Sequence, residues 1–230
     1  MALITMGIGI QGISGSVGGT TFARSRYGAY ARARIKPVNP SSGAQNKARS
    51  AMASMKTLWA ALTQLQRDAW ETYGANVSMV VSMGQPIKLT GWNHFVRSNT
   101  AISGAGLTMV KDAPELFSLA ETDETITVTG DESDKKIKVA FNNLLGWANE
   151  VGGAMMIYAG LPVDPSINFY GGPFRYVGKI AGGVVPPTSP ASLNPVTSVF
   201  AGQRVYIKAR IVRADARLSG AFQSTGLVVA

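Results

Sequence analysis

The spacing of apolar residues changes once along this 230-residue chain, and that change limits the folds available to it. Between residues 41 and 101, apolar side chains recur every three or four positions, which is typical of amphipathic helices. Beyond Ala113-Pro114 the period becomes two and stays two, which is typical of half-buried strands. The sequence therefore predicts an α+β protein whose helices precede its main β domain.

The helical part predicts two helices that follow each other almost directly, and a short third helix. The first is expected over residues 44–62, after a serine that can cap its N-terminus. Thr63–Gln66 has the form of a capping box, and the helix that it starts is expected to end before Gly74. The third helix is expected over residues 91–101. We expect these helices to form a hairpin-like docking unit over residues 41–112.

Seven short segments of period two follow, separated by turns rich in Gly, Pro, Asp and Ser. This pattern predicts an immunoglobulin-like or fibronectin type III-like sandwich over residues 113–230. The proline-rich stretch 185–190 is interpreted as a stiff surface connection within this domain. The expected strands are 116–119, 125–129, 137–141, 154–159, 174–180, 204–212 and 222–229.

The first forty residues predict a basic, Gly-rich β-arm. In TTFARSRYGAYARARIK, residues 20–36, the cations occupy even positions and small or apolar residues occupy odd ones. Because successive strand residues point to opposite faces, an extended ribbon would carry its charge on one face. The cations are Arg24, Arg26, Arg32, Arg34 and Lys36.

The loop of a hairpin in this arm decides where its charges lie. A two-residue loop would divide the cations between the two faces, whereas a three-residue loop at residues 27–29 would pair Arg24 with Arg32 and keep them together. Like charges opposed across a ladder are destabilising, so the three-residue register makes sense mainly with an anionic partner. This reasoning gives the first indication of an interface.

The charge is distributed unevenly. Residues 1–100 contain eleven Lys/Arg against Asp68 and Glu71, whereas residues 101–230 contain eleven Lys/Arg and eleven Asp/Glu. The whole formal net charge of +9 therefore belongs to the first part of the chain. Such asymmetry predicts that the first part faces something anionic.

Residues 7–12, GIGIQG, match the spacing of a dinucleotide-binding loop. That loop needs a buried strand before it, a helix after it and an acidic residue about twenty positions later, and this chain meets none of these conditions. We therefore predict no nucleotide cofactor. We interpret Gly15, Gly18 and Gly19 as positions where a protein partner approaches the backbone closely.

The inventory of reactive side chains is poor. The chain has no cysteine and one histidine, His94, which excludes disulfides, thiolate zinc sites and most acid/base constellations. His94 is interpreted as a packed or capping histidine and not as a ligand, and the acidic cluster 131–134 as a solvated turn and not a metal site. The sequence predicts no catalytic residue, no metal, no cofactor and no small-molecule substrate. The opening residues predict no signal peptide, and no segment is apolar enough to predict a membrane span.

Three stretches of the first hundred residues resemble an uncharacterised family of bacteriophage and prophage proteins. They are ISGSVGGTTFARSRYGAYARARIKPVNPSSGAQNKARSAM (13–52), LWAALTQLQRDAW (58–70) and LTGWNHF (89–95). In that family a Gly-rich basic segment and a Trp-rich helical hairpin precede a fibronectin-like domain. The resemblance implies a virion component that is assembled in the cytoplasm of the bacterial host.

A second resemblance lies near the C-terminus. Residues 210–219, RIVRADARLS, are similar to the last hairpin of fibronectin-like domains, where an Asp-Gly-Arg-x-Ser sequence often forms the turn. Ala216 stands here in the place of the glycine.

These observations favour a non-enzymatic virion structural protein, such as a capsid decoration, cement or connector component. Its basic first half would dock on capsid or tail subunits, or on copies of itself in an oligomer or lattice, and its sandwich would project. We expect no membrane partner. The residues expected to meet the partner are Arg24, Arg26, Tyr27, Tyr30, Arg32, Arg34, Lys36, Trp59 and Trp70.

Two alternatives remain at this stage. The basic arm could bind nucleic acid, with its tyrosines stacking on bases, although the segment 64–73 carries too many acidic residues for a recognition helix. The sandwich could instead bind a receptor or a carbohydrate as a tail module, through exposed aromatic residues near its loops. Those residues are Tyr158, Phe169, Tyr170 and Tyr176.

Overall fold

The computed structural model divides the chain into two compact units, Met1–Lys47 and Ala48–Ala230, which we call the N-terminal unit and the main unit. The division lies in the first turns of the first helix. The expected boundary near residue 112 has no counterpart in this division, because the later helices and the main sheet form one unit. The described residues are 2–3, 12–25, 28–36, 38–80 and 84–229.

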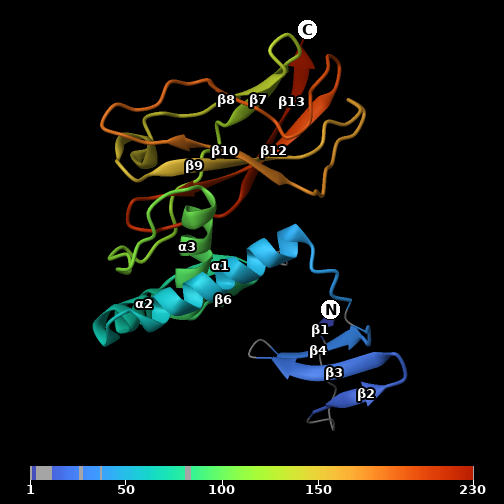
Figure 1. Ribbon diagram of the computed structural model, residues 1–230, viewed down its shortest axis with the longest axis vertical. Helices are drawn as coiled ribbons and strands as arrows, with labels where there is room; N and C mark the ends of the chain where they lie inside the picture. Colours follow the sequence, from blue (N-terminus) through green and yellow to red (C-terminus); the bar gives the residue numbers. More distant parts are fainter. Residues whose placement is uncertain (1, 4–11, 26–27, 37, 81–83, 230) are drawn as a thin grey trace. The chain divides into compact units, whose positions relative to one another are not determined.

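The N-terminal unit contains a four-stranded antiparallel sheet in the order β1-β4-β3-β2 (Figure 1). The predicted ribbon is confirmed as the central hairpin of this sheet. Gly18, with φ of 57°, lies in the turn between β2 and β3, a backbone conformation that glycine adopts without strain. The strands are β1 (Ala2–Leu3), β2 (Gly15–Val17), β3 (Thr20–Ser25) and β4 (Gly28–Ala33).

Three helices follow, α1 (Gly43–Ala60), α2 (Gln64–Asn76) and α3 (Gly91–Gly104). The predicted capping box is confirmed: the Thr63 hydroxyl accepts a hydrogen bond from the backbone N–H of Gln66, whose side chain accepts one from the backbone N–H of Thr63. A short hairpin of β5 (Ser78–Val80) and β6 (Pro86–Lys88), which the sequence did not indicate, joins α2 to α3.

The prediction that the second helix ends before Gly74 is wrong, because α2 continues through this glycine to Asn76. Gly74 serves a close approach of backbones. A Cβ at this position would lie 2.7 Å from Gly91 N and from Leu89 O. Gly91 has the reciprocal role, since a Cβ there would overlap with the backbone of Trp70 and Glu71. The two glycines therefore let α3 start directly against α2.

The rest of the main unit contains one seven-stranded sheet that is nearly closed. Five of its strand pairs are antiparallel, and one short pair, between β13 and β7, is parallel. The two edge strands approach each other, since a Cβ added to Gly178 would lie 3.3 Å from Leu193 Cδ2. The order is β10 (Arg175–Ala181), β9 (Ala154–Ala159), β12 (Arg204–Val212), β13 (Phe222–Val229), β7 (Thr127–Asp131), β8 (Lys136–Ala140) and β11 (Ala191–Leu193).

The bounds expected for β9, β12 and β13 are confirmed, whereas the strand expected at 116–119 does not form. That segment is held by other parts of the unit: the Tyr73 hydroxyl donates to Ser118 O, and the Arg217 guanidinium donates to the Ser118 hydroxyl. The missing strand is supplied by β11, which directly follows the proline-rich stretch.

Strand β9 lies between two hydrophobic clusters and explains why the helices and the sheet form one unit. Its residues Met155 and Ile157 belong to the cluster inside the sheet, together with Val128, Val139 and Ile207. The alternate residues Ala154 and Met156 belong instead to the cluster of the helices, together with Met55, Leu62, Trp70, Tyr73, Phe95 and Leu218. Because both faces of β9 are covered, its sequence AMMIYA is apolar throughout and not alternating.

Candidate functional site

The basic residues singled out in the arm lie in and just after the central hairpin of the N-terminal unit. Arg24 is on β3 and Arg32 on β4, while Arg34 and Lys36 follow β4, and all four are exposed. Tyr30 of β4 is half-buried. The other two expected contacts, Arg26 and Tyr27, lie outside the described residues.

The register of this hairpin is that of the two-residue loop, and not that of the three-residue loop that would keep the cations together. Ser25 pairs with Gly28, Arg24 with Ala29 and Thr21 with Arg32. An even position thus pairs with an odd one along the ladder, as a two-residue connection requires. Arg24 and Arg32 consequently lie on opposite faces of the sheet, and the cations do not form the single charged face that the alternation predicted.

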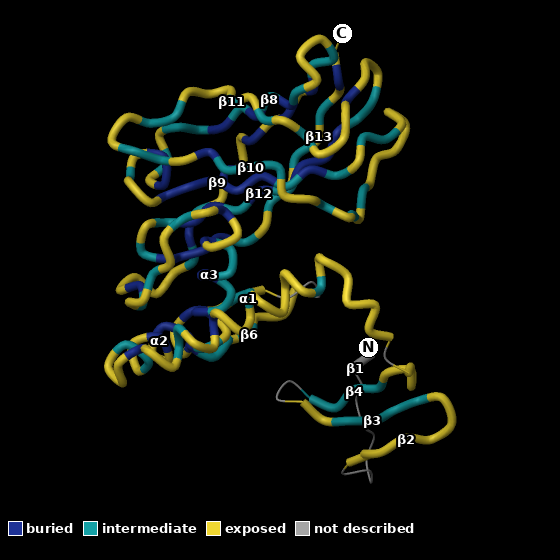
Figure 2. Tube along the Cα trace, viewed as in Figure 1, coloured by how far each residue is buried: buried dark blue, intermediate teal, exposed yellow. Residues whose placement is uncertain are grey.

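The N-terminal sheet buries none of its described side chains. Every described residue from 12 to 47 is exposed or half-buried, and none falls into the buried class (Figure 2). In Figure 2 the described trace of β2, β3 and β4 is yellow and teal, while dark blue is confined to the main unit. This sheet is held by backbone hydrogen bonds and has no hydrophobic core among its described residues.

The charge of the N-terminal unit is uncompensated within the unit. Residues 1–47 contain six Lys/Arg and no Asp or Glu. Any carboxylate or phosphate that neutralises these cations must come from outside this unit. An exposed sheet with cations on both faces and no acidic residue is suited to contact an acidic macromolecule.

The two tryptophans expected at the interface have different positions. Trp70 is fully buried, its indole N–H donates to Lys111 O at 2.8 Å, and its ring packs edge-on against Phe95. Trp70 therefore stabilises the main unit, and its expected role in partner binding is wrong. Trp59 is half-buried and packs edge-on against Trp92, so part of its surface stays accessible.

His94 is a packed histidine, as the sequence indicated. Its side chain is fully buried, lies edge-on to Tyr73, and has no hydrogen-bond partner at either ring nitrogen. Burial, and to a lesser extent the charge of Arg97, lowers the pKa of His94 to about 4. The ring is therefore neutral near pH 7.

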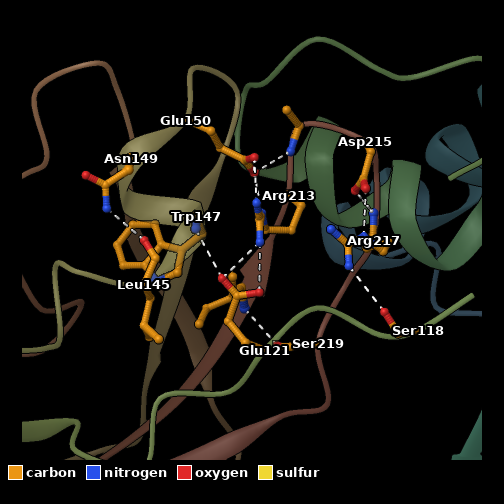
Figure 3. A network of polar contacts seen from close by, with 12 residues as sticks. Ser118, Glu121, Leu145, Trp147, Asn149, Glu150, Arg213, Asp215, Arg217 and Ser219 are labelled. Atoms are coloured by element: carbon orange, nitrogen blue, oxygen red, sulfur yellow. Dashed lines mark hydrogen bonds and ion pairs between the residues drawn. The ribbon is translucent and has the colours of Figure 1, made fainter. Parts of the chain in front are cut away.

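A polar network lies beside the end of β12 and is drawn in Figure 3. The Arg213 guanidinium donates to Glu150 at 2.6 Å and to Glu121 at 3.0 Å, and the hydrogen bond with Glu150 raises the pKa of Arg213. The Arg217 guanidinium donates to Asp215. Because each charged group in this network is paired, we interpret it as a structural clamp between distant loops.

The acidic cluster at 131–134 forms a hairpin turn, as expected. The Asp131 carboxylate accepts hydrogen bonds from Ser133 and Asp134 and forms an ion pair with Lys138. The hydrogen bond from Lys138 holds the pKa of Asp131 far below the usual range. Across the described residues, no group of three His, Cys, Asp or Glu could hold a metal ion. Nor is any described helix long and apolar enough to cross a membrane.

The aromatic residues of the receptor-binding alternative differ in how accessible they are. Phe169 is 83% exposed and Tyr176 is 38% exposed. Tyr158 is half-buried against Tyr176, and the Tyr170 ring stacks on Tyr206 at a centroid distance of 5.7 Å. Phe169 and Tyr170 line a small pocket of about 170 Å³.

The structure also brings together two arginines that the sequence analysis did not single out. Arg97 of α3 and Arg210 of β12 line the same open pocket in the main unit. No local motif marks them, because they are far apart in the chain. Only the packing of α3 over the outer face of β9 and β12 brings them close.

Comparison with known proteins gives a distant structural likeness. No protein-family model matches the chain, and no curated protein matches it. Among solved structures, the chain is similar to an Fn3-like protein from Clostridium thermocellum, with 13% identity and a TM-score of 0.32. The match covers 49% of this chain and 97% of that one. The architecture described above therefore rests on strand order and core, not on this likeness.

Proposed function

We propose that this chain is a non-enzymatic structural protein of a bacteriophage particle, which docks through its N-terminal unit and presents a fibronectin type III-like sandwich. One observation carries the docking proposal: the N-terminal sheet has hydrogen-bonded strands but no buried residue in its described part. A small sheet without a hydrophobic face packed on something is marginally stable in water. In this proposal a partner supplies the apolar surface that stabilises it.

The chemistry of that partner follows from the charge. The described cations of the N-terminal unit are exposed, and the unit has no acidic residue of its own. An acidic protein surface would therefore gain ion pairs with both faces of the sheet, because Arg24 and Arg32 point in opposite directions. Contact on both faces suits a sheet inserted between neighbouring subunits of a shell, as in a cement or connector component.

The fibronectin-like assignment is supported by strand order. Three strands, β7, β8 and β11, pair as one set, and four strands, β10, β9, β12 and β13, pair as another. Only two residue pairs, Val228 with Gly130 and Val229 with Asp131, join the two sets. Side chains from both sets of strands share one core, as in the two packed sheets of a sandwich. Ala216 has a φ of 68°, in the place where the resembling turn has glycine.

The assignment to a phage particle is supported by the sequence resemblance of residues 13–52, 58–70 and 89–95 described above. The alternative of nucleic-acid binding is supported by the cations of the N-terminal unit, and it predicts an affinity that falls steeply with salt concentration. Each phosphate contact to duplex DNA contributes a slope of about −0.9 to log K against log salt.

The test is co-sedimentation of the full chain with purified shells of the phage that encodes it. The decisive variant carries Arg24→Gln, Arg32→Gln and Arg34→Gln together. The matched control removes three exposed cations of the main unit, with Lys56→Gln, Lys88→Gln and Lys111→Gln. We expect the first variant to weaken shell binding by about tenfold or more, and the control to bind like the unmodified chain.

Equal binding by both variants would contradict docking through the N-terminal unit. A parallel titration with a short DNA duplex separates the two functions. We expect the full chain to bind the DNA duplex only weakly at physiological salt. Tight binding of DNA that collapses as salt rises, without binding to shells, would replace the structural proposal with nucleic-acid binding.

A further inference from the structure

We propose that the main unit also carries a binding site for a carboxylate attached to an apolar carbon skeleton, built around Arg97 and Arg210. We call this site the arginine pocket. It is open, has a volume of about 380 Å³, and lies where α3 packs against the outer face of β9 and β12. Its size is within the range of small-ligand sites.

The elements place the polar side chains of the pocket on two facing surfaces. Arg97 and Thr100 are three positions apart on α3, so they lie on the same side of this helix. Tyr158 and Arg210 lie on neighbouring strands, since Tyr158 pairs with Lys208 and Met156 pairs with Arg210. Both therefore point to the face of the sheet that the helices cover.

Among the described residues, no carboxylate compensates the charge of the two guanidinium groups. Arg97 donates to the backbone carbonyls of Leu218 at 2.8 Å and Ser219 at 2.6 Å, which are neutral acceptors. Within the described part of the chain, no carboxylate forms an ion pair with Arg97 or Arg210. Burial, and to a lesser extent the charge of Arg210, lowers the pKa of Arg97 to about 10. A bound anion would relieve this repulsion, because it supplies the charge that the site lacks.

Hydroxyl groups complete the set of donors. Burial raises the pKa of the Tyr158 hydroxyl, so it stays protonated and able to donate at neutral pH. The Thr100 hydroxyl is buried and has no hydrogen-bond partner in the described structure. Guanidinium and hydroxyl groups together are donors that suit an oxyanion.

The remaining walls indicate what is attached to the anion. Met52 and Val96 line the pocket with apolar atoms, as does Ala101. A fully hydrated inorganic anion would gain little from these walls, whereas a carboxylate with an apolar skeleton would bury that skeleton against them. Such a group occurs in a free organic acid and in a glutamate side chain at a protein surface, so both sources share this chemistry.

This inference is independent of the docking proposal. The arginine pocket uses residues of the main unit only, and none of them belongs to the N-terminal sheet. A chain that fails to bind shells can still bind the carboxylate, and the reverse also holds.

The test is an NMR titration of the full chain with three probes: 4-phenylbutyrate, its neutral analogue 4-phenylbutanamide, and inorganic phosphate. A short blocked peptide with a central glutamate is the fourth arm. We expect saturable binding of 4-phenylbutyrate, with shifts at Arg97 and Tyr158, and no comparable binding of the amide or of phosphate. Saturable binding of the peptide as well would identify a protein carboxylate as a source, whereas binding of the acid alone would identify a free organic acid.

The decisive variant is Arg210→Gln, with Lys208→Gln on the same strand as its charge-matched control. We expect Arg210→Gln to lower the affinity for 4-phenylbutyrate by about tenfold or more and Lys208→Gln to leave this affinity unchanged. We also expect the ligand-free Arg210→Gln variant to be at least as stable as the unmodified chain, because the substitution removes repulsion with Arg97.

Three results would overturn the proposal. The first is no saturable binding of either carboxylate probe, and the second is equal affinity for phosphate or the amide. The third is a marked loss of stability in Arg210→Gln, which would show that Arg210 is a structural residue of the fold.

Discussion

The strands of the N-terminal unit and strand β9 of the main unit are equally well paired, yet they differ in what covers them. Strands β3 and β4 form a continuous antiparallel ladder in which no described side chain is buried. Strand β9 pairs on both sides and is buried on both faces. The comparison shows that ladder hydrogen bonds define a strand, whereas burial of apolar surface decides whether the strand is stable in isolation.

The sequences explain this difference. Strand β9 reads AMMIYA, and each side chain has an apolar cluster to enter. Strands β3 and β4 read TTFARS and GAYARA, where alanine, glycine and arginine leave little apolar surface to bury. The N-terminal sheet is therefore expected to depend on its partner, and the main unit on its own core.

The largest contrast is expected when phenylalanine is removed from each unit. Phe95 is almost fully buried, so Phe95→Ala is expected to lower the free energy of unfolding by about 3–5 kcal/mol. Phe22 is only half-buried, so Phe22→Ala is expected to cost less than about 1 kcal/mol in the free chain. Urea unfolding followed by far-ultraviolet circular dichroism measures both. Similar losses would mean that the N-terminal sheet has a core after all.

A second contrast uses glycine in one helix. Gly91→Ala forces a methyl group into the backbone of α2, and we expect a loss of about 3 kcal/mol because neither backbone can move aside. Gly104, at the other end of α3, has nothing within 4 Å of an added Cβ, so Gly104→Ala is expected to be neutral or slightly stabilising. Thermal unfolding of the two variants compares them directly. If Gly91→Ala were as stable as Gly104→Ala, the close contact of α2 and α3 would be refuted.

The pH response is expected to differ between the units as well. The folded main unit keeps His94 neutral down to about pH 4, whereas the unfolded chain protonates it below about 6.5. The unfolded state therefore binds more protons between these values, and stability is lost as pH falls through this window, by roughly 2 kcal/mol at pH 5.

Urea midpoints at pH 7 and pH 5 measure this loss, with His94→Gln as the control that should remove it. The N-terminal unit has no histidine and no carboxylate side chain, so its circular dichroism should not change over the same range. An unchanged midpoint for the unmodified chain would show that His94 titrates normally.

The smallest expected effect on stability comes from the charges of the arm. Replacing Arg24, Arg32 and Arg34 by glutamine together should change the free energy of unfolding by less than about 0.5 kcal/mol, because all three are exposed. The same variant is expected to lose shell binding. A large loss of stability without a loss of shell binding would show that these arginines stabilise the fold and do not bind the partner.

Much of the fold could be predicted from residues close together in the chain. The capping box at Thr63 depends on a motif of four residues, and the bounds of β9 and β12 depend on local periodicity. These local signals were sufficient to predict the three features. The segment 116–119 predicts a strand because three of its four side chains are apolar. Its position depends instead on hydrogen bonds of Ser118 with the distant residues Tyr73 and Arg217.

Features that depend on contacts between distant residues could not be predicted in the same way. The helical continuation through Gly74 depends on the approach of Gly91. The sequence allows two registers of the basic hairpin that differ by one residue, and the one that forms puts Arg24 and Arg32 on opposite faces. The arginine pocket depends on α3 packing over β12, for which the sequence contains no local signal.

Hydrogen exchange of the free, monomeric full chain tests the central claim most directly. Amides of β3 and β4 are expected to exchange with little protection, because nothing buried holds their strands. Amides of β9 and β12 are expected to exchange only through global unfolding of the main unit. Comparable protection of all four strands in the free monomer would contradict the account, since the N-terminal sheet would then be stable without a partner.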